Sequence, residues 1–325
     1  MKKNIKIKLK NKQSNLLLKF KIFWIFLILI IYIINIRLHH SGNKNKISTS
    51  LLAKKTKNIK LKSKIIAISY SNNRYQRQLK LNKKSALELG KVDEYYSYGR
   101  DDLDQKFKEK NKDILTRIRG NGYWLWKPYI INKTIVEKLK DGDYLIYTDA
   151  CTLYMDSVYL FVKFLKLHKM PMWMDRLNHK ESRYTKKDAF ILLGADMPFY
   201  SQTNQYQAGI QIYKKSDYTV KFIQDWLYYC QDKRIITDDN NTLNQPNYKD
   251  FKDNRHDQSI LSLLIKKYGE VNSGFSNLNL TELINRKKII KQKIICIYRR
   301  MHFKNYSDLI QKCRKRMRLT KHYLK

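Results

Sequence analysis

The sequence predicts an α/β domain with a mainly parallel, mixed sheet flanked by helices. The first observation is Ile65–Ser69, a short apolar run between polar residues, which is typical of a buried strand. The second is a helical segment at Arg74–Leu89, succeeded by a strand near Val92–Tyr98. The third is another apolar run, Tyr144–Tyr147, further along the chain. Strands that alternate with helices favour an α/β fold.

The rest of the domain continues this alternation. Proline suits the first turn of a helix, aspartate suits the cap before one, and short apolar runs suit strands. We expect, in chain order, a helix that begins at Pro128, a helix from Asp156 to Leu167, strands at Met172–Met174 and Ile210–Tyr213, helices at Asp217–Tyr229 and Asp257–Tyr268, and a strand within Ile289–Tyr298.

The N-terminal part of the chain predicts a membrane anchor. Residues 1–21 are strongly basic, and the stretch 22–36 is almost entirely apolar. Few small residues come after it, so an uncleaved signal-anchor is favoured over a cleaved signal peptide. The excess of Lys before the span places the N-terminus in the cytoplasm. We therefore expect a single-pass type II membrane protein whose folded part is lumenal or otherwise extracytoplasmic.

Three further segments come after the expected anchor. Residues 37–63 are polar and basic with little periodicity, which indicates a stem or linker. The folded domain is expected at 64–285. The strongly basic segment 286–325 is expected to be a C-terminal extension of that domain.

The charge of the chain invites a nucleic-acid interpretation. Lys and Arg total 67 against 28 acidic residues, a formal net charge of +39. The Lys residues, however, are spread along the whole chain, and it contains no RNA-binding, zinc-finger or helix-turn-helix signature. We therefore expect no specific nucleic-acid partner, although attraction to anionic surfaces such as membranes is expected.

The four cysteines show no metal-binding spacing. Cys151, Cys230, Cys296 and Cys313 include no C-x-x-C pair, so zinc and thioredoxin-type sites have little support. Scattered cysteines are commonly buried apolar residues. One or two disulfides are compatible with a lumenal domain, and the sequence alone does not pair them.

An aromatic and basic segment, Gly122–Tyr129, is the strongest candidate for ligand binding. Trp124 and Trp126 offer flat rings for a sugar face, and Lys127 offers a charge for a phosphate. The same rings would also suit the core of a helix that begins at Pro128. Because the two Trp are two residues apart, we expect at most one to line a pocket while the other packs in the core.

Polar side chains lie directly after two of the expected strands. Ser69, Tyr70 and Arg74 come after the first strand, and Asp149 comes after Tyr144–Tyr147. Ligands of open α/β sheets bind outside the carboxyl ends of the strands. A Tyr there can stack on a nucleotide base, and an Arg can pair with phosphate. The alternative interpretations are an exposed loop and a turn or cap aspartate.

Five ordered motifs carry a resemblance to a known family. They are GYWLWKP from Gly122, GDYLIYTDA from Gly142, YTKKDAF from Tyr184, QYQAG from Gln205 and RHDQSI from Arg255. Together, over roughly Lys64–Gly269, they resemble the GT-A type nucleotide-sugar glycosyltransferases. The resemblance implies a single GT-A-like domain after the transmembrane helix. It also implies transfer of a sugar from a nucleotide-diphosphate donor to a glycan, lipid or protein acceptor.

The resemblance also implies roles for two acidic positions. Many GT-A enzymes hold Mn²⁺ or Mg²⁺ with Asp-x-Asp, and here the sequence is Asp149-Ala-Cys151, so the second acid is absent. Asp149 is therefore a candidate for a metal ligand, for catalysis or for binding donor hydroxyls. Asp257 is a candidate catalytic base, and His256 is a candidate metal or phosphate ligand. Asp257 also suits a helix cap.

The remaining candidates belong to the donor pocket. Gln205, Ala208 and Gly209 precede a strand, and small residues there would let a ligand approach the backbone. Packing between elements would need the same residues. We interpret Lys186 and Asp188 as surface charges. A non-catalytic, membrane-tethered protein that binds carbohydrates or nucleotide sugars is the alternative function, because the second acid is missing.

Overall fold

The computed structural model describes residues 63–269, 294–298 and 301–322. The expected anchor at 22–36, the linker up to residue 62 and the boundary expected at 285 lie outside these residues. Among the helices of the described ranges, none combines the length and the apolar character needed to cross a membrane. Residues from Ser63 onward form one compact unit.

A mixed sheet of five strands organises this unit. Its order is β2-β1-β3-β6-β5. The first three strands are parallel to one another, whereas β6 is antiparallel to both β3 and β5. The bounds are β1 Ile65–Tyr70, β2 Glu94–Tyr98, β3 Tyr144–Thr148, β5 Met172–Lys180 and β6 Asn204–Lys214. The α/β class and the mainly parallel, mixed sheet are thus confirmed.

The register places the candidate residues at one edge of the sheet. Ile68 of β1 lies opposite Tyr147 of β3, so the carboxyl ends of these two parallel strands end together. Every side chain of β1 and β3 is buried, as expected for strands covered on both faces. The residues at the two strand ends, from Ser69 on and at Asp149, therefore lie at the same edge.

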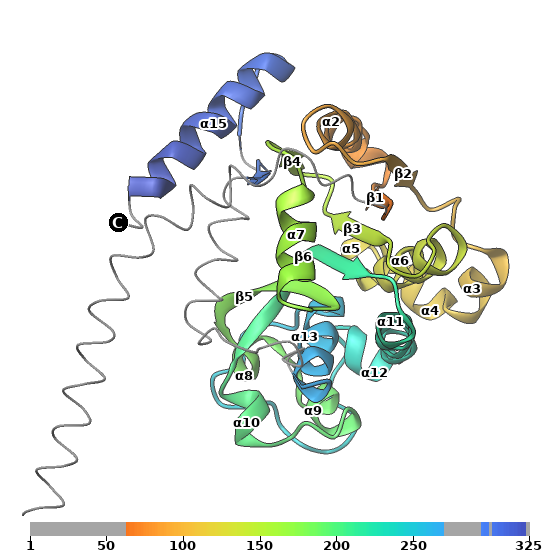
Figure 1. Cartoon of the computed structure of the whole chain (residues 1–325). Helices are drawn as coiled ribbons and strands as arrows, with labels where there is room; N and C mark the ends of the chain where they lie inside the picture. The colour runs from red at the N-terminus through yellow and green to blue at the C-terminus, as the bar shows by residue number, and fades with distance from the viewer. Residues whose placement is uncertain (1–62, 270–293, 299–300, 323–325) are drawn as a thin grey trace, which may run out of the picture. The chain divides into compact units, whose positions relative to one another are not determined.

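Helices cover the sheet (Figure 1). The helix α2 packs against β1 and β2, while α6, α11 and α13 lie side by side against the other strands. The larger helices are α2 Gln76–Glu88, α6 Trp126–Glu137, α7 Tyr159–Leu167, α11 Asp217–Cys230 and α13 Asp257–Lys267. The short ones are η1 Asn73–Tyr75, α3 Gln105–Lys110, α4 Lys112–Leu115, α5 Gly120–Tyr123, α8 Glu181–Tyr184, α9 Lys187–Leu192, α10 Pro198–Ser201 and α12 Lys233–Ile236.

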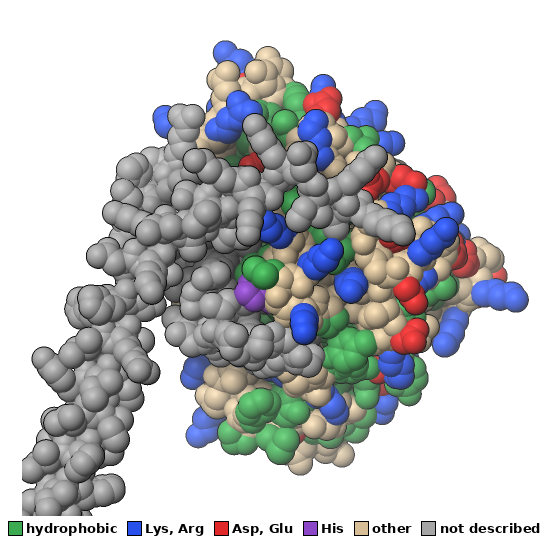
Figure 2. Space-filling view, viewed as in Figure 1, with side chains coloured by type: hydrophobic (Ala, Val, Ile, Leu, Met, Phe, Trp, Pro, Cys, Tyr) green, Lys and Arg blue, Asp and Glu red, His purple; other side chains and the backbone are tan. Residues whose placement is uncertain are grey.

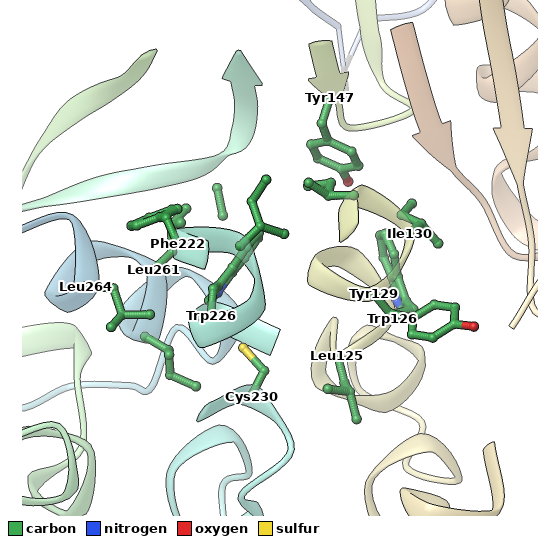
Figure 3. Close-up of a cluster of buried hydrophobic side chains, with 14 of the residues drawn as sticks. Leu125, Trp126, Tyr129, Ile130, Tyr147, Phe222, Trp226, Cys230, Leu261 and Leu264 are labelled. Atoms are coloured by element: carbon green, nitrogen blue, oxygen red, sulfur yellow. The ribbon is translucent and has the colours of Figure 1, made fainter. Parts of the chain in front are cut away.

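The main hydrophobic core lies between the sheet and the helices α6, α11 and α13. Figure 3 shows rings and aliphatic chains of α6 on one side of the cluster and of α11 and α13 on the other. Trp226 is fully buried, and its indole Nε1 donates to the backbone oxygen of Asp257 (2.9 Å). This bond ties the core to the first residue of α13.

The C-terminal segment packs onto the same unit. β4 (Thr152–Tyr154) pairs antiparallel with β7 (Ile295–Ile297), and α15 (Tyr306–His322) comes after β7. A second apolar cluster joins Leu153, Tyr298 and Leu309. Cys296 and Cys313 form a disulfide, whereas Cys151 and Cys230 are buried and not disulfide-bonded. The pairing that the sequence left open is thereby one bridge between β7 and α15.

Several local predictions are wrong, and the observed contacts show what these residues do instead. Asp156 does not cap α7: its carboxylate accepts from Ser157 N, and the helix begins after Val158. Asp257 is the first residue of α13 rather than its cap, which is His256. Lys186 and Asp188 are buried, and Asp188 accepts from Thr242 N (2.6 Å) and Oγ1 (2.9 Å).

The antiparallel strands are longer than the sequence indicated. β5 extends to Lys180 and β6 begins at Asn204, beyond the apolar runs expected to define them. Their outer halves are partly exposed, so the apolar pattern marks only their buried parts. The short β4 and the basic α15 were not predicted from the sequence.

Candidate functional site

Asp149 stands directly after β3, held by two neighbouring strands. Its backbone N donates to Gly209 O on β6 (2.9 Å), and its Oδ1 accepts from Tyr147 OH (2.8 Å). About a quarter of the side chain is exposed (23%). A carboxylate fixed in this way can bind hydroxyls or a cation at the sheet edge without reorganising.

Lys127 bridges Asp149 to a second carboxylate. Its Nζ lies 3.6 Å from Asp149 Oδ1 and 3.0 Å from Asp257 Oδ2. The Lys127 side chain is only 4% exposed, and its Nζ also lies 5.3 Å from the centre of the Tyr147 ring. Three segments far apart in sequence thus supply one buried set of charges. We call Lys127, Asp149 and Asp257 the charged centre.

Asp257 is the buried member of the charged centre. Burial raises its pKa from 3.8 to about 6, with Asp149 adding in the same direction, while Lys127 opposes the shift. The backbone oxygen of Asp257 is fixed by Trp226. A carboxyl with a pKa near 6 is mostly ionised at pH 7 yet close enough to neutrality to accept and release a proton.

Lys127 comes after a left-handed turn of the chain. Residues Gly120 to Trp124 all have positive φ, from 50° to 92°, and Tyr123 N donates to Arg119 O (2.8 Å). Each non-glycine residue in this conformation costs about 1–2 kcal/mol. A Cβ on Gly120 would lie 2.3 Å from the Trp124 ring, so glycine is required there. Such strain commonly marks functional segments.

The two tryptophans after this turn have different surroundings. Trp126 is 5% exposed and stacks on Tyr70 with ring centres 3.8 Å apart. Trp124 is half-buried and stacks on the His256 ring at 5.4 Å. Asn121, within the turn, donates to the hydroxyl of Tyr70. The aromatic segment therefore joins the end of β1 to the start of α13.

His256 is tied to a neighbouring loop rather than to Asp149. Its Nδ1 lies 2.7 Å from Ile236 O, and its Nε2 lies 3.7 Å from Asp238 Oδ1. Burial lowers its pKa below 6.5, so the ring is neutral at pH 7. Its backbone is unusual for a non-glycine residue, with φ 54° and ψ −119°. This strained step turns the chain into α13.

The β6 candidates form the wall behind the charged centre. A Cβ on Gly209 would lie 3.1 Å from Asp149 Oδ2, so glycine lets the carboxylate approach the strand. Ala208 N donates to Gln258 Oε1 (3.2 Å), and Gln258 Nε2 donates to Gln205 Oε1 (3.0 Å). Gln205 and Ala208 are buried. Their packing role is thus visible, and donor binding by them stays a prediction.

The candidates expected after the first strand are divided between the end of β1 and the surface beyond it. Ser69 is buried within the strand, and Tyr70 is buried against Trp126. Burial raises the pKa of Tyr70 to about 12. Arg74 is exposed, and its guanidinium lies 5.9 Å from the centre of the Tyr75 ring. Its phosphate role stays a prediction.

The described residues do not supply a complete set of protein ligands for a divalent cation. In the ranges that the structure covers, no group of three or more His, Cys, Asp and Glu side chains is placed around a metal position. Mn²⁺ and Mg²⁺ prefer several oxygen ligands, whereas the second carboxylate beside Asp149 belongs to Asp257 and is paired with an ammonium. The expected pairing of Asp149 with His256 is unsupported, because His256 is directed at Ile236 and Asp238.

Sequence reasoning missed several residues of the site. Tyr147 supports Asp149, Gln258 links α13 to β6, and Asp238 faces His256. Tyr147 and Gln258 lie inside the motifs that carry the resemblance. Tyr147 stands two residues before Asp149, and Gln258 comes directly after Asp257, so their positions could have identified them. Asp238 lies in a loop without any motif, and only the fold brings it to His256.

Comparison with known proteins gives structural matches only. No protein-family model matches the chain, and no curated protein matches it in sequence. It is similar in structure to the bifunctional glycosyltransferase WbbM (9% identity, 79% of this chain and 50% of WbbM, TM-score 0.43). It is also similar to mouse xyloside xylosyltransferase 1 (10% identity, 64% of this chain and 83% of that protein, TM-score 0.38). A third match is the galactosyltransferase LgtC (12% identity, 78% of this chain and 95% of LgtC, TM-score 0.37). This chain therefore spans half the length of WbbM, and matches at this level assign no activity.

Proposed function

We propose that this protein is a glycosyltransferase that moves a sugar from a nucleotide-diphosphate donor to a glycan, lipid or protein acceptor. The charged centre carries the proposal. Lys127 lies between Asp149 and Asp257 at the carboxyl ends of β1 and β3, where α/β sheets bind ligands. The motifs that resemble GT-A glycosyltransferases supply all three of these residues.

Sugar transfer requires stabilisation of the leaving group and removal of the acceptor proton, and the charged centre can supply both. The bond between the anomeric carbon and the donor phosphate breaks, and its electrons leave with the nucleoside diphosphate. Lys127 stabilises the charge that develops on that leaving group. The acceptor oxygen forms the new bond to the anomeric carbon, and Asp257 takes its proton. Asp149, partly exposed, orients donor hydroxyls.

The uncovered part of one face shows no basic stripe of the kind that a nucleic-acid site presents. Figure 2 shows Lys and Arg interspersed with Asp and Glu on the uncovered part of one face, rather than gathered in one basic groove. Several basic side chains are also paired with carboxylates, such as Arg119 with Asp238 and Arg234 with Asp232. A specific nucleic-acid site would present an unpaired basic stripe.

We further propose that the domain works outside the cytoplasm, on a membrane anchor at 22–36. The Cys296–Cys313 disulfide supports this location, because disulfides persist in oxidising compartments. Carbonate extraction of membranes should leave the full-length protein in the pellet. Its release at full length would rule the anchor out.

A panel of nucleotide-diphosphate sugars tests the activity directly. Release of nucleoside diphosphate would be measured for the full-length protein, for Asp149→Asn and for Asp141→Asn. Asp141 is an exposed aspartate shortly before β3 and serves as the matched control. We expect turnover with at least one donor, an about hundredfold or larger loss in Asp149→Asn, and no loss in the control. Binding of a nucleotide sugar without turnover of any donor would instead favour a non-catalytic binding protein.

A further inference from the structure

A recess of the molecule lies at the segment that leads into α13. This cavity has a volume of about 540 Å³ and is lined by Arg119, Lys186 and the segments 237–241, 245–247 and 251–254. We call it the polar cavity. Small-molecule sites are typically about 300–1,000 Å³. Residues 253 and 254 precede the start of α13, so the cavity adjoins the strained step that leads to Asp257.

The charges around the polar cavity are balanced, and several of them are held by contacts within the protein. Arg119 donates to Asp238 Oδ2 and to Asp253 Oδ2, at 2.9 Å each. Lys186 Nζ donates to the backbone oxygen of Asp239 (2.6 Å). The lining contains equal numbers of basic and acidic residues, three of each: Arg119, Lys186, Lys252, Asp238, Asp239 and Asp253. A lining with balanced charges favours a neutral ligand over a charged one.

His256 supplies a buried acceptor that faces the lining. Its Nδ1 must donate to Ile236 O, because a carbonyl oxygen can only accept. In the neutral ring Nε2 is then an acceptor. It is buried without a hydrogen-bond partner among the described residues, 3.7 Å from the carboxylate oxygen Oδ1 of Asp238. Two acceptors this close call for a donor between them, which a hydroxyl group provides.

Asn254 repeats this pattern on another wall. The side chain is 3% exposed, and its Nδ2 donates to the backbone oxygens of Ile235 (3.1 Å) and Thr237 (3.3 Å). These two carbonyls fix the orientation of the amide, so Oδ1 is the atom that has no partner among the described residues. The lining also contains further amides and one aromatic ring, namely Asn240, Asn241, Gln245, Asn247 and Phe251.

We propose that the polar cavity is the acceptor subsite and that it binds a neutral sugar residue of a glycan. Sugar hydroxyls both donate and accept, so they match amides and paired carboxylates, and Phe251 offers an apolar surface for a sugar face. His256 Nε2 and Asp238 receive a hydroxyl proton. The residue after His256 is Asp257 of the charged centre, so the strained step into α13 links the polar cavity to the group proposed to take the acceptor proton. This assignment rests on the proposed function.

A cavity-filling substitution tests the subsite. Gln245 lines the cavity and is exposed, so Gln245→Trp fills the space at little risk to folding. Gln105→Trp is the matched control, because Gln105 is exposed on α3 and its side chain donates to Glu109. Calorimetry with the full-length protein would use neutral disaccharides, with sialylated and sulfated disaccharides alongside. Hydrolysis of the donor without acceptor would be measured in parallel.

We expect neutral disaccharides to bind the wild type and the Gln105→Trp variant equally. In Gln245→Trp, binding should weaken at least tenfold while donor hydrolysis stays within about twofold of the wild type. Asn254→Ser, which removes the side-chain amide from the lining, should also weaken sugar binding, and urea unfolding would show whether this variant is folded. Preference for the acidic disaccharides, or undiminished binding in Gln245→Trp, would overturn the subsite. Sugar binding without hydrolysis of any donor would instead overturn the proposed function.

Discussion

In the part of the chain that the structure describes, the same arrangement, one cation between two aspartates, occurs twice and in opposite surroundings. In the charged centre, Lys127 is 4% exposed between Asp149 and Asp257. At the polar cavity, Arg119 is 45% exposed between Asp238 and Asp253. Water and salt screen the exposed set, whereas the buried one interacts in a low dielectric. The buried set can therefore shift pKa values and act on a reaction, and the exposed set mainly gives shape and specificity.

Removal of Lys127 should have the largest effect. Lys127→Met leaves Asp257 buried beside Asp149 without its cation, which typically costs about 3–5 kcal/mol. Urea unfolding at pH 7 would measure this loss, and donor turnover should disappear with it. Lys133→Met is the control on the same helix, because its pair with Asp104 is exposed and is worth at most about 1 kcal/mol. Equal losses in the two variants would show that the charged centre has no special energetic role.

Removal of the proposed base, Asp257, should have the second largest effect, after that of Lys127→Met. Asp257→Asn should lower transfer by about 10²–10⁴ while calorimetric nucleotide binding persists, since only the proton acceptor is lost. Asp217→Asn is the matched control, because Asp217 is likewise the first residue of its helix but is exposed. It should transfer sugar at the wild-type rate. If both variants behave alike, Asp257 acts only at the helix terminus.

The raised pKa of Asp257 predicts how stability depends on pH. The folded protein holds this proton up to about pH 6, whereas the unfolded chain releases it near 3.8. Between these values the folded state binds more protons, so stability falls as the pH rises, by up to about 3 kcal/mol. Asp257→Asn has no such proton. The variant should therefore gain stability relative to the wild type from pH 4 to pH 6.5, measured by urea unfolding at each pH.

A constant difference between the two proteins over this range would contradict the raised pKa. It would mean that Lys127 offsets the burial of Asp257 completely, so that the carboxyl titrates near its ordinary value. The proton-accepting role would then need another residue. The charged centre would then resemble the exposed ion pairs at the polar cavity, because its burial would shift no carboxyl pKa.

The sequence indicated the charged centre better than the polar cavity. Asp149, Lys127 and Asp257 could be found because strand ends, a helix start and recognisable motifs mark them locally. Their meeting through one ammonium could not, since it depends on how α6 and α13 pack. Asp238 and Asn254 lie in loop segments without periodicity. The left-handed turn at 120–124 has a local signal in Gly120-Asn121-Gly122, but the positive φ of Tyr123 and Trp124 has none.

The smallest effect expected is that of Arg119. Arg119→Met removes two exposed ion pairs, each worth about 0.2–1 kcal/mol, so unfolding should show a loss of about 1 kcal/mol. Because exposed charges are screened, this difference should vanish in 1 M salt, whereas that of Lys127→Met should persist. Donor hydrolysis should be unchanged, while binding of a neutral disaccharide weakens as Asp238 and Asp253 lose their anchor. A salt-independent loss, or a fall in donor hydrolysis, would mean that the polar cavity is coupled to the charged centre and that the two regions act as one site.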